Sequence, residues 1–194
     1  DIDPREIMTS DAFLGFILGL FSGLLSTLLS AIVMFWLQGR RDVQRESLKQ
    51  RREDTRVARN WAQEGRKASL RGFDLTGANL SGKDLAGADL EDCTLESAQM
   101  WETNFTDANL IRANFRNAEL IEVKLCNARL HLANFDGAVL RRVDFSGAKL
   151  RRTRLLNART EDCIWTDAKI DDTTEIDFAL RQAIVAQTTT PSSS

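Results

Sequence analysis

The sequence predicts an all-β solenoid of stacked coils, preceded by a long apolar helix and closed by a short C-terminal helix. From residue 70 to residue 155 each fifth residue is large and apolar, and after Thr160 the series resumes at Trp165 and Ile170. Each tenth residue from Ala68 to Ala168 is an alanine, two positions before one of these apolar residues. Helices and flat strands repeat every 3.6 and 2.0 residues, so a five-residue period indicates units that bury their apolar side chains only by stacking on their neighbours.

The repeated unit also resembles a known family. The segments "ANL", "ADL", "ANF" and "AEL", in register over residues 66–170, are similar to the A(D/N)LXX unit of the pentapeptide-repeat family. That resemblance implies a right-handed quadrilateral β-helix over residues 68–173, in which residues twenty positions apart stack as interior ladders. Lys83 occupies an interior small-residue position, and we expect its stem to reach outward because a buried, unpaired amine is costly. The motif is specific for a fold and says almost nothing about function.

Before the repeats lies a segment that predicts a membrane span. Residues 1–11 form a charged tail that we expect to be exposed, and residues 12–37 contain no charged side chain. A helix of this length measures about 39 Å, enough to cross a hydrocarbon core of about 30 Å with some tilt. A signal peptide is the competing interpretation, but its basic residues come before the apolar region, and here they come after it. Trp36 sits where an interfacial anchor is expected.

The flanking charges predict the orientation of this span. The first eleven residues carry four acids and one arginine, whereas residues 38–67 carry ten bases and five acids. Basic flanks remain on the cytoplasmic side, which places the N-terminus outside and the C-terminal β-helix in the cytoplasm. Arg40, Arg41 and Arg45 then fall at the lipid headgroups.

Small residues follow one stripe of the predicted membrane helix. They are spaced by three and four positions, as on one helical face, and a repeated small-xxx-small pattern favours close approach of another membrane helix. The alternative is that glycine and serine are simply frequent in membrane helices. The predicted helix-packing residues are Gly15, Gly19, Ser22, Gly23, Ser26 and Ser30.

The remaining segments are expected to close the two ends of the rod. Residues 38–67 are rich in helix-forming residues and predict a charged juxtamembrane helix, with Val57 and Trp61 covering the first coil. Residues 174–187 predict a capping helix that begins near Thr174, and residues 188–194 predict a disordered tail.

The outer surface of the rod is banded by charge. Residues 73–107 contain eight acids and one lysine, residues 108–159 contain eleven bases and four acids, and residues 160–178 contain seven acids and one lysine. One interpretation is that these charges pair between coils; the other is that the basic band and nearby outward apolar residues bind a partner. The predicted partner-binding residues are Trp101, Ile111, Ile121, Leu132, Arg141, Arg142, Arg151 and Arg152.

The sequence gives little support for catalysis or for cofactor binding. The chain has one histidine, His131, at an outward position, and its three cysteines have no metal-ligand spacing, so we expect ordinary reduced thiols. The net charge of −2 argues against bulk binding of nucleic acid. We therefore expect a non-enzymatic protein with no metal, no cofactor and no small-molecule substrate.

Three classes of function fit these features. The first is a membrane-anchored scaffold or accessory subunit of a membrane protein complex, which contacts the bilayer and other subunits, or a second copy of itself, through its membrane helix. The second, implied by the family resemblance, is a DNA mimic that protects a topoisomerase. The third is a self-assembling membrane effector.

Overall fold

The computed structural model describes residues 10–66 and 68–189, without the side chains of residues 10–29, 31, 32, 37, 39, 188 and 189. The chain divides into two compact units, residues 1–48 and 49–194. The elements, in chain order, are α1 (Ser10–Asn60), β1 (Gln99–Trp101), β2 (Glu119–Ile121), β3 (Val139–Arg141), β4 (Arg159–Glu161) and α2 (Phe178–Thr189).

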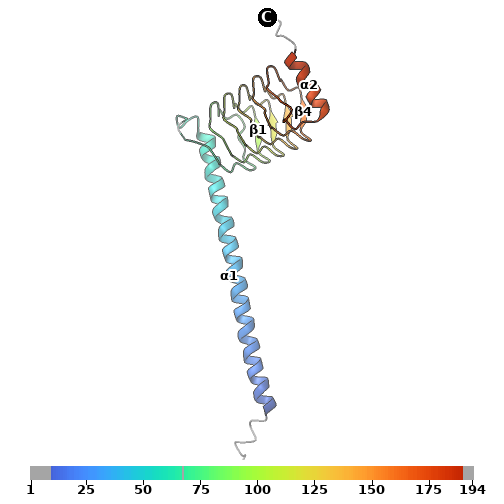
Figure 1. Ribbon diagram of the computed structural model, residues 1–194. Coiled ribbons are helices and arrows are strands. Elements are labelled where there is room, and N and C mark those ends of the chain that lie inside the picture. The colour runs from blue at the N-terminus through green and yellow to red at the C-terminus, as the bar shows by residue number, and fades with distance from the viewer. Residues whose placement is uncertain (1–9, 67, 190–194) are drawn as a thin grey trace, which may run out of the picture. The chain divides into compact units, whose positions relative to one another are not determined.

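The second unit contains a stack of coils whose backbone repeats every twenty residues (Figure 1). Strands β1 to β4 pair in parallel and in sequence order, with Met100 opposite Leu120 and Leu120 opposite Leu140. Three further ladders of isolated parallel bridges begin at Asp74, Asp84 and Asp89. Four ladders, one on each side of a coil, make the stack a four-sided β-helix.

We name the four sides by the residues that point into the interior. Side A contains Leu90, Leu110, Leu130 and Leu150; side B contains Leu75, Leu95, Phe115, Phe135 and Leu155; side C, which carries the strands, contains Leu80, Met100, Leu120 and Leu140; side D contains Leu85, Phe105, Leu125, Phe145 and Trp165.

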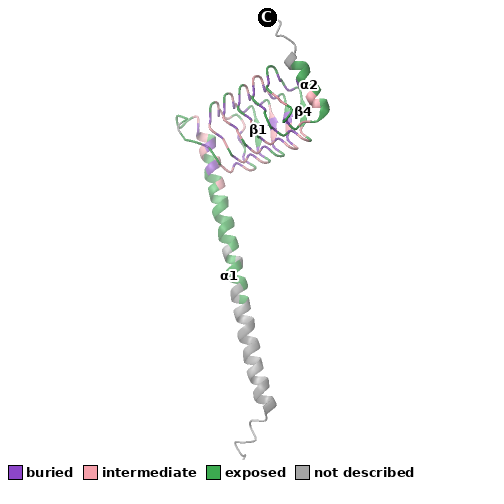
Figure 2. Ribbon diagram, in the orientation of Figure 1, coloured by how far each residue is buried: buried purple, intermediate pink, exposed green. Residues whose placement is uncertain are grey.

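These ladders form one continuous core (Figure 2). Phe115 stacks on Phe135 with ring centroids 4.5 Å apart, and buried alanines occupy the positions two residues before the large side chains of sides A and C. The corners turn through residues with positive φ, and at Gly137 an added Cβ would lie 2.6 Å from Oδ1 of Asn117 in the preceding coil. The predicted interior therefore forms. Thr160, where the sequence breaks the apolar series, is exposed in β4.

The last turn of α1 and the residue after it cover the first coil, as the sequence predicts for Val57 and Trp61. Trp61 is 4% exposed, and its indole Nε1 donates a hydrogen bond to the carbonyl oxygen of Ala68 at 2.7 Å. Val57 and Ala58 also pack against the core. This burial protects apolar surface that no preceding coil covers.

The other end closes differently from the prediction. One extra residue enters the repeat, so that Arg154 pairs with Glu175, and Thr174 Oγ1 donates to the carbonyl oxygen of Leu150 at 2.9 Å. Thr174 is therefore part of the last coil, and α2 begins at Phe178, four residues later than predicted. The helix packs on the core through Leu180 and Ile184.

The predicted membrane span, residues 12–37, consists mostly of residues whose side chains the structure leaves undescribed. The backbone there belongs to α1. Among the residues that the structure describes, no helix offers an apolar run of sufficient length to cross a membrane.

Candidate functional site

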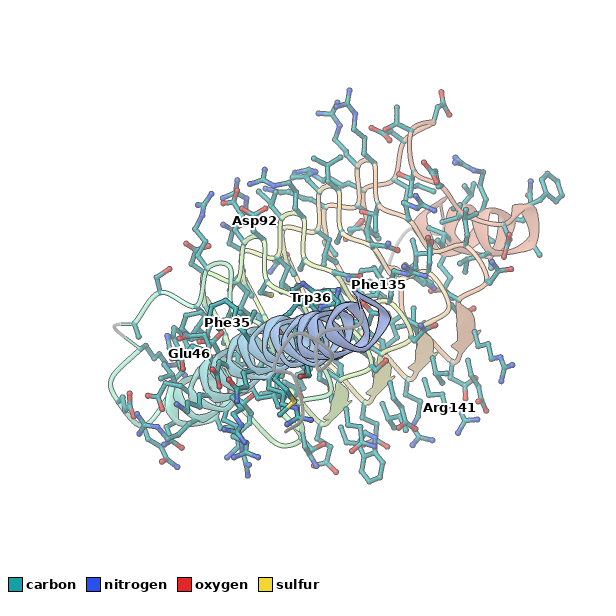
Figure 3. The ribbon with its side chains drawn as sticks, turned by 90° about the horizontal axis from the view of Figure 1, so that it is seen from below. Phe35, Trp36, Glu46, Asp92, Phe135 and Arg141 are labelled. Carbon is teal, nitrogen blue, oxygen red and sulfur yellow. The ribbon has the colours of Figure 1, made fainter. Side chains whose placement is uncertain are left out.

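Because leucine, phenylalanine and alanine fill the interior of the coils, the candidate functional site is their outer surface. On each side, the residues just before and just after the interior residue face outward, and so does the corner residue that follows. In Figure 3, Asp92 and Arg141 lie on opposite outer sides of the coils. Side chains twenty positions apart form outward columns with a rise of about 4.8 Å per coil.

Many of the outward charges pair between neighbouring coils. On side A, Arg112 contacts Glu91 and Asp92 in the preceding coil at 2.6 Å each, and Arg71 contacts the same Glu91 at 2.8 Å. The hydrogen bond from Arg112 holds the pKa of Asp92 below its ordinary value. Glu91 thus links three successive coils.

Three of the four arginines in the predicted partner patch are also paired. Arg141 contacts Glu161 at 3.0 Å, Arg142 contacts Glu122 at 2.6 Å, and Arg151 contacts Asp171 at 3.0 Å. Exposed ion pairs of this kind contribute about 0–1 kcal/mol each to the free energy of unfolding. Because of these ion pairs, the three arginines already have acidic partners within the rod.

A different set of cations is left without an ion pair in the described part of the chain. Arg129, Lys149 and Lys169 are exposed, stand before successive interior residues of side A, and are bridge partners of one another. With Asp107, Asp167 and neighbouring polar residues they line a groove of ≈ 640 Å³. No motif in the sequence distinguishes these three cations, although the twenty-residue period applied to the outward positions aligns all of them.

The pKa of His131 is affected by the positive charges of this surface. It is half-buried on side A, next to the same column. Burial lowers its pKa below the ordinary value of 6.5, and the nearby charges of Arg129, Arg151 and Lys149 lower it further. His131, Leu132, Arg151 and Arg152 line a second cavity on the surface.

The apolar residues predicted to bind a partner lie on different sides of the rod. Trp101 lies opposite Ile121 in the parallel register of side C, in the same column as Arg141. Leu132, on side A, is 46% exposed, and Ile111 is half-buried one coil earlier. The predicted partner-binding residues therefore lie on two sides of the rod, A and C.

The cysteines show no sign of activation. Cys93 and Cys163 are buried, and the Sγ of the half-buried Cys126 donates to Oδ2 of Asp144 at 3.1 Å. Burial raises the pKa of Cys93 to about 12, and burial together with Asp144 raises the pKa of Cys126 to about 11. Within the described residues, no group of three His, Cys, Asp or Glu side chains is placed to hold a metal ion.

In the first unit, the described part of α1 exposes large apolar side chains beside arginines. Phe35 is 79% exposed and Trp36 is 55% exposed, with the guanidinium of Arg40 lying 3.7 Å from the centroid of the Trp36 ring. Arg41, Arg45 and Ser30 are exposed as well. The side chains of the other predicted helix-packing residues, Gly15, Gly19, Ser22, Gly23 and Ser26, lie outside the described residues.

Comparison with known proteins agrees with the coil geometry. A family model described as "Pentapeptide repeat region" matches residues 88–165, and one described as "Pentapeptide repeats (8 copies)" matches residues 66–96. No curated protein matches the chain significantly.

Solved structures that match part of this chain include the following three. HetL, involved in heterocyst differentiation regulation in the cyanobacterium Nostoc sp. strain PCC 7120, is 31% identical over 53% of this chain, with a TM-score of 0.40. The match spans about half (51%) of HetL. A protein of the Arabidopsis thaliana thylakoid lumen is 27% identical over 60% of this chain and 77% of its own, with a TM-score of 0.42. QnrB1, a plasmid-mediated fluoroquinolone resistance protein, is 16% identical over 60% of this chain and 85% of its own, with a TM-score of 0.33.

The family models together cover residues 66–165, and the interior ladders and twenty-residue coils lie in this range. Through this domain the chain belongs to the pentapeptide-repeat family.

Proposed function

We propose that this protein is a non-enzymatic, membrane-anchored scaffold or accessory subunit of a membrane protein complex, and that side A of its β-helix binds an acidic surface of another subunit. The observation that carries the proposal is the column of Arg129, Lys149 and Lys169, three exposed cations on a backbone fixed by parallel pairing, with no ion pair to any residue that the structure describes. Like charges about 4.8 Å apart repel one another, and an acidic partner relieves that repulsion.

The chemistry of the surrounding surface favours a protein partner. Leu132 offers an exposed apolar contact on the same side, and Asp107 and Asp167 border the cationic groove. Discrete carboxylates of a protein surface can be arranged around these two acids, whereas the uniform phosphate charge of duplex DNA meets repulsion there. The same column departs from the broadly acidic surface that a DNA mimic requires.

The membrane anchor in this proposal is supported by the sequence and by the described end of the apolar segment. Residues 12–37 carry no charge, and Phe35 and Trp36 are exposed over more than half of their surface. A bilayer, with arginines at its headgroups, is the environment that suits such side chains. The proposed arrangement has the N-terminus outside and the β-helix in the cytoplasm, with no nucleic-acid partner.

The test is crosslinking in native membranes, followed by mild-detergent purification and mass spectrometry. Charge reversal at the column (R129E, K149E, K169E) should abolish recovery of a defined membrane complex. The matched control reverses three exposed cations on the other sides of the rod, which also lack an ion pair in the described part of the chain (R116E, K124E, R159E), and should leave recovery unchanged. Equal recovery with both triple variants would remove side A from the proposal.

Recovery of the chain alone, as a homo-oligomer, would instead favour a self-assembling membrane effector. In that case Gly19→Leu, which fills the predicted small-residue stripe, should abolish the oligomer. If the oligomer persists in Gly19→Leu, the stripe is not its packing face.

A further inference from the structure

Lys83 interrupts an interior ladder of the β-helix. The residues stacked after it, two positions before the interior residues of side D, are Thr103, Val123, Val143 and Cys163, and all four are buried. Lys83 is half-buried in the first coil, which no earlier coil covers. There its side chain lines a cavity of ≈ 240 Å³ together with residues from the last turns of α1.

The helix contributes a cluster of hydrogen-bond donors to this cavity. Arg52, Arg56 and Arg59 recur at four- and three-residue steps, which places them on one helical face. Thr55 and Asn60 complete the lining. The lining therefore contains four cationic side chains, a hydroxyl and an amide, and no carboxylate.

The cations of this cavity are largely free to bind a ligand. Within the described residues, Arg52, Arg59 and Lys83 form no ion pair. Arg56 donates to Glu53 through Nε at 3.0 Å and through Nη2 at 2.5 Å. Its Nη1 is left to donate to a ligand. This contrasts with the rod itself, where arginines such as Arg112 and Arg142 are matched by acids of the adjoining coil.

The usual structural role of arginine at the end of a helix does not account for Arg59. Basic residues commonly bond to the last carbonyl groups of a helix. Here backbone N–H groups already do so: Trp61 N–H donates to the carbonyl of Ala58, and those of Gln63 and Glu64 donate to the carbonyl of Asn60. The carbonyl of Trp61 accepts in turn from the N–H of Arg66. The carbonyls of Ala58 and Asn60 therefore do not need the guanidinium of Arg59 as a donor.

We propose that the cavity of Lys83, Arg52, Arg56 and Arg59 binds a phosphate group, as inorganic phosphate or a small phosphomonoester. Guanidinium groups present paired donors that match phosphate oxygens, and the lysine adds a point charge. The cavity is smaller than the roughly 300–1,000 Å³ of pockets for drug-sized ligands, so it suits one phosphate group. This site is independent of side A and of the proposed scaffold role.

The test measures binding of inorganic phosphate to the full chain in detergent, by calorimetry at constant ionic strength with chloride as the balancing anion. Lys83→Ala should weaken binding at least tenfold without destabilising the fold, because alanine suits the small-residue positions of the interior ladders. Arg52→Gln with Arg59→Gln should do the same. Lys124→Ala and Arg116→Gln, which remove exposed charges elsewhere on the rod, should leave the affinity unchanged.

Two results would overturn this proposal. One is the absence of saturable phosphate binding by the full chain at millimolar concentrations. The other is an equal loss of affinity in the Lys83→Ala and Lys124→Ala variants, because that would indicate nonspecific charge screening. Glycerol phosphate, as the small phosphomonoester, should compete with inorganic phosphate, and a failure to compete restricts the site to the free ion.

Discussion

The backbone N–H of Asp74 donates a hydrogen bond to Oδ2 of Asp54 at 3.0 Å, twenty residues earlier in the chain. In later coils the equivalent N–H donates to a backbone carbonyl of the preceding coil, as Thr94 does to Phe73 at 2.9 Å. No coil precedes Asp74, so the Asp54 carboxylate supplies the missing acceptor. Asp54 is 4% exposed, and its Oδ1 accepts from Gln50 Nε2 at 2.8 Å.

Asp54→Ala should therefore destabilise the β-helix by about 1–3 kcal/mol, because it leaves a partly buried N–H unsatisfied. Asp54→Asn should cost less, since its amide oxygen can still accept the hydrogen bond. Urea unfolding followed by circular dichroism measures both. Equal losses in the two variants would mean that the hydrogen bond to Asp74 is not what stabilises the first coil.

At the other end of the rod, Trp165 stacks on Phe145 with ring centroids 4.2 Å apart and ring planes 2° from parallel. Trp165 is 2% exposed, so Trp165→Ala should cost about 3–5 kcal/mol through lost burial and an interior cavity. Trp101 is 49% exposed, and Trp101→Ala should cost less than about 1 kcal/mol. Denaturant midpoints of the two variants test the contrast, and similar midpoints would contradict it.

Thr103 carries a buried hydroxyl that donates to the carbonyl oxygen of Leu80 at 3.0 Å. Thr103→Val should destabilise the protein by about 1 kcal/mol, because the hydrogen bond is lost while the carbonyl keeps a second bond from Lys83 N–H at 3.1 Å. Valine packs well at this position, as Val123 and Val143 do in the next coils. Thermal unfolding gives the difference, and a more stable variant would mean that the hydroxyl is a net cost.

The raised thiol pKa values predict slow alkylation of the folded protein. With the pKa of Cys126 at about 11, its thiolate at pH 8 is on the order of a hundredfold scarcer than that of a free cysteine. Asp144→Asn should speed the reaction only in part, since burial is the larger cause of the shift. Iodoacetamide labelling followed by mass spectrometry gives the rate. The unfolded chain is the control, and equal rates in the folded and unfolded chains would refute the prediction.

His131 is the only histidine, so its titration can be followed as a single imidazole signal by NMR. We expect a folded-state pKa below 6.5, and Arg129→Gln with Lys149→Gln should raise it. Because the folded-state pKa is lower than the unfolded one, this group's contribution to stability is present above about 6.5 and is lost as the pH falls toward the folded-state pKa. Binding of an acidic partner to side A should raise the pKa, and a pKa that does not change on binding would place the partner elsewhere.

Sequence alone was enough to predict the interior of this protein. The five-residue period assigned Leu110, Leu130 and Phe135 to the interior of a solenoid, and the resemblance to the pentapeptide-repeat family implied that such side chains stack twenty positions apart. The same logic identified Lys83 as an exception and Trp61 as a cover for the first coil. These predictions depend on local backbone repetition and on the cost of exposing apolar side chains, and neither requires knowledge of the neighbours of a particular residue.

The surface could not be predicted in the same way, because the partner of an outward charge depends on which side chains meet it across coils. The sequence groups Arg141, Arg142 and Arg151 into one basic band, yet each of them meets an acid of a neighbouring coil. Arg129, Lys149 and Lys169 have no ion-pair partner among the described residues, although nothing in the sequence distinguishes them from the paired arginines. The extra residue before Glu175 likewise becomes visible only through its pairing with Arg154.

The amino-acid sequence by itself thus determined the repeat, the apolar interior and the segment that covers the first coil, since burial of apolar side chains depends on spacing along the chain. Tertiary structure decided which charges are neutralised, how Asp54 replaces a missing carbonyl, and where Lys83 meets the arginines of α1. These contacts join residues about twenty or more positions apart through side chains with many rotamers, so only the folded coils fix them.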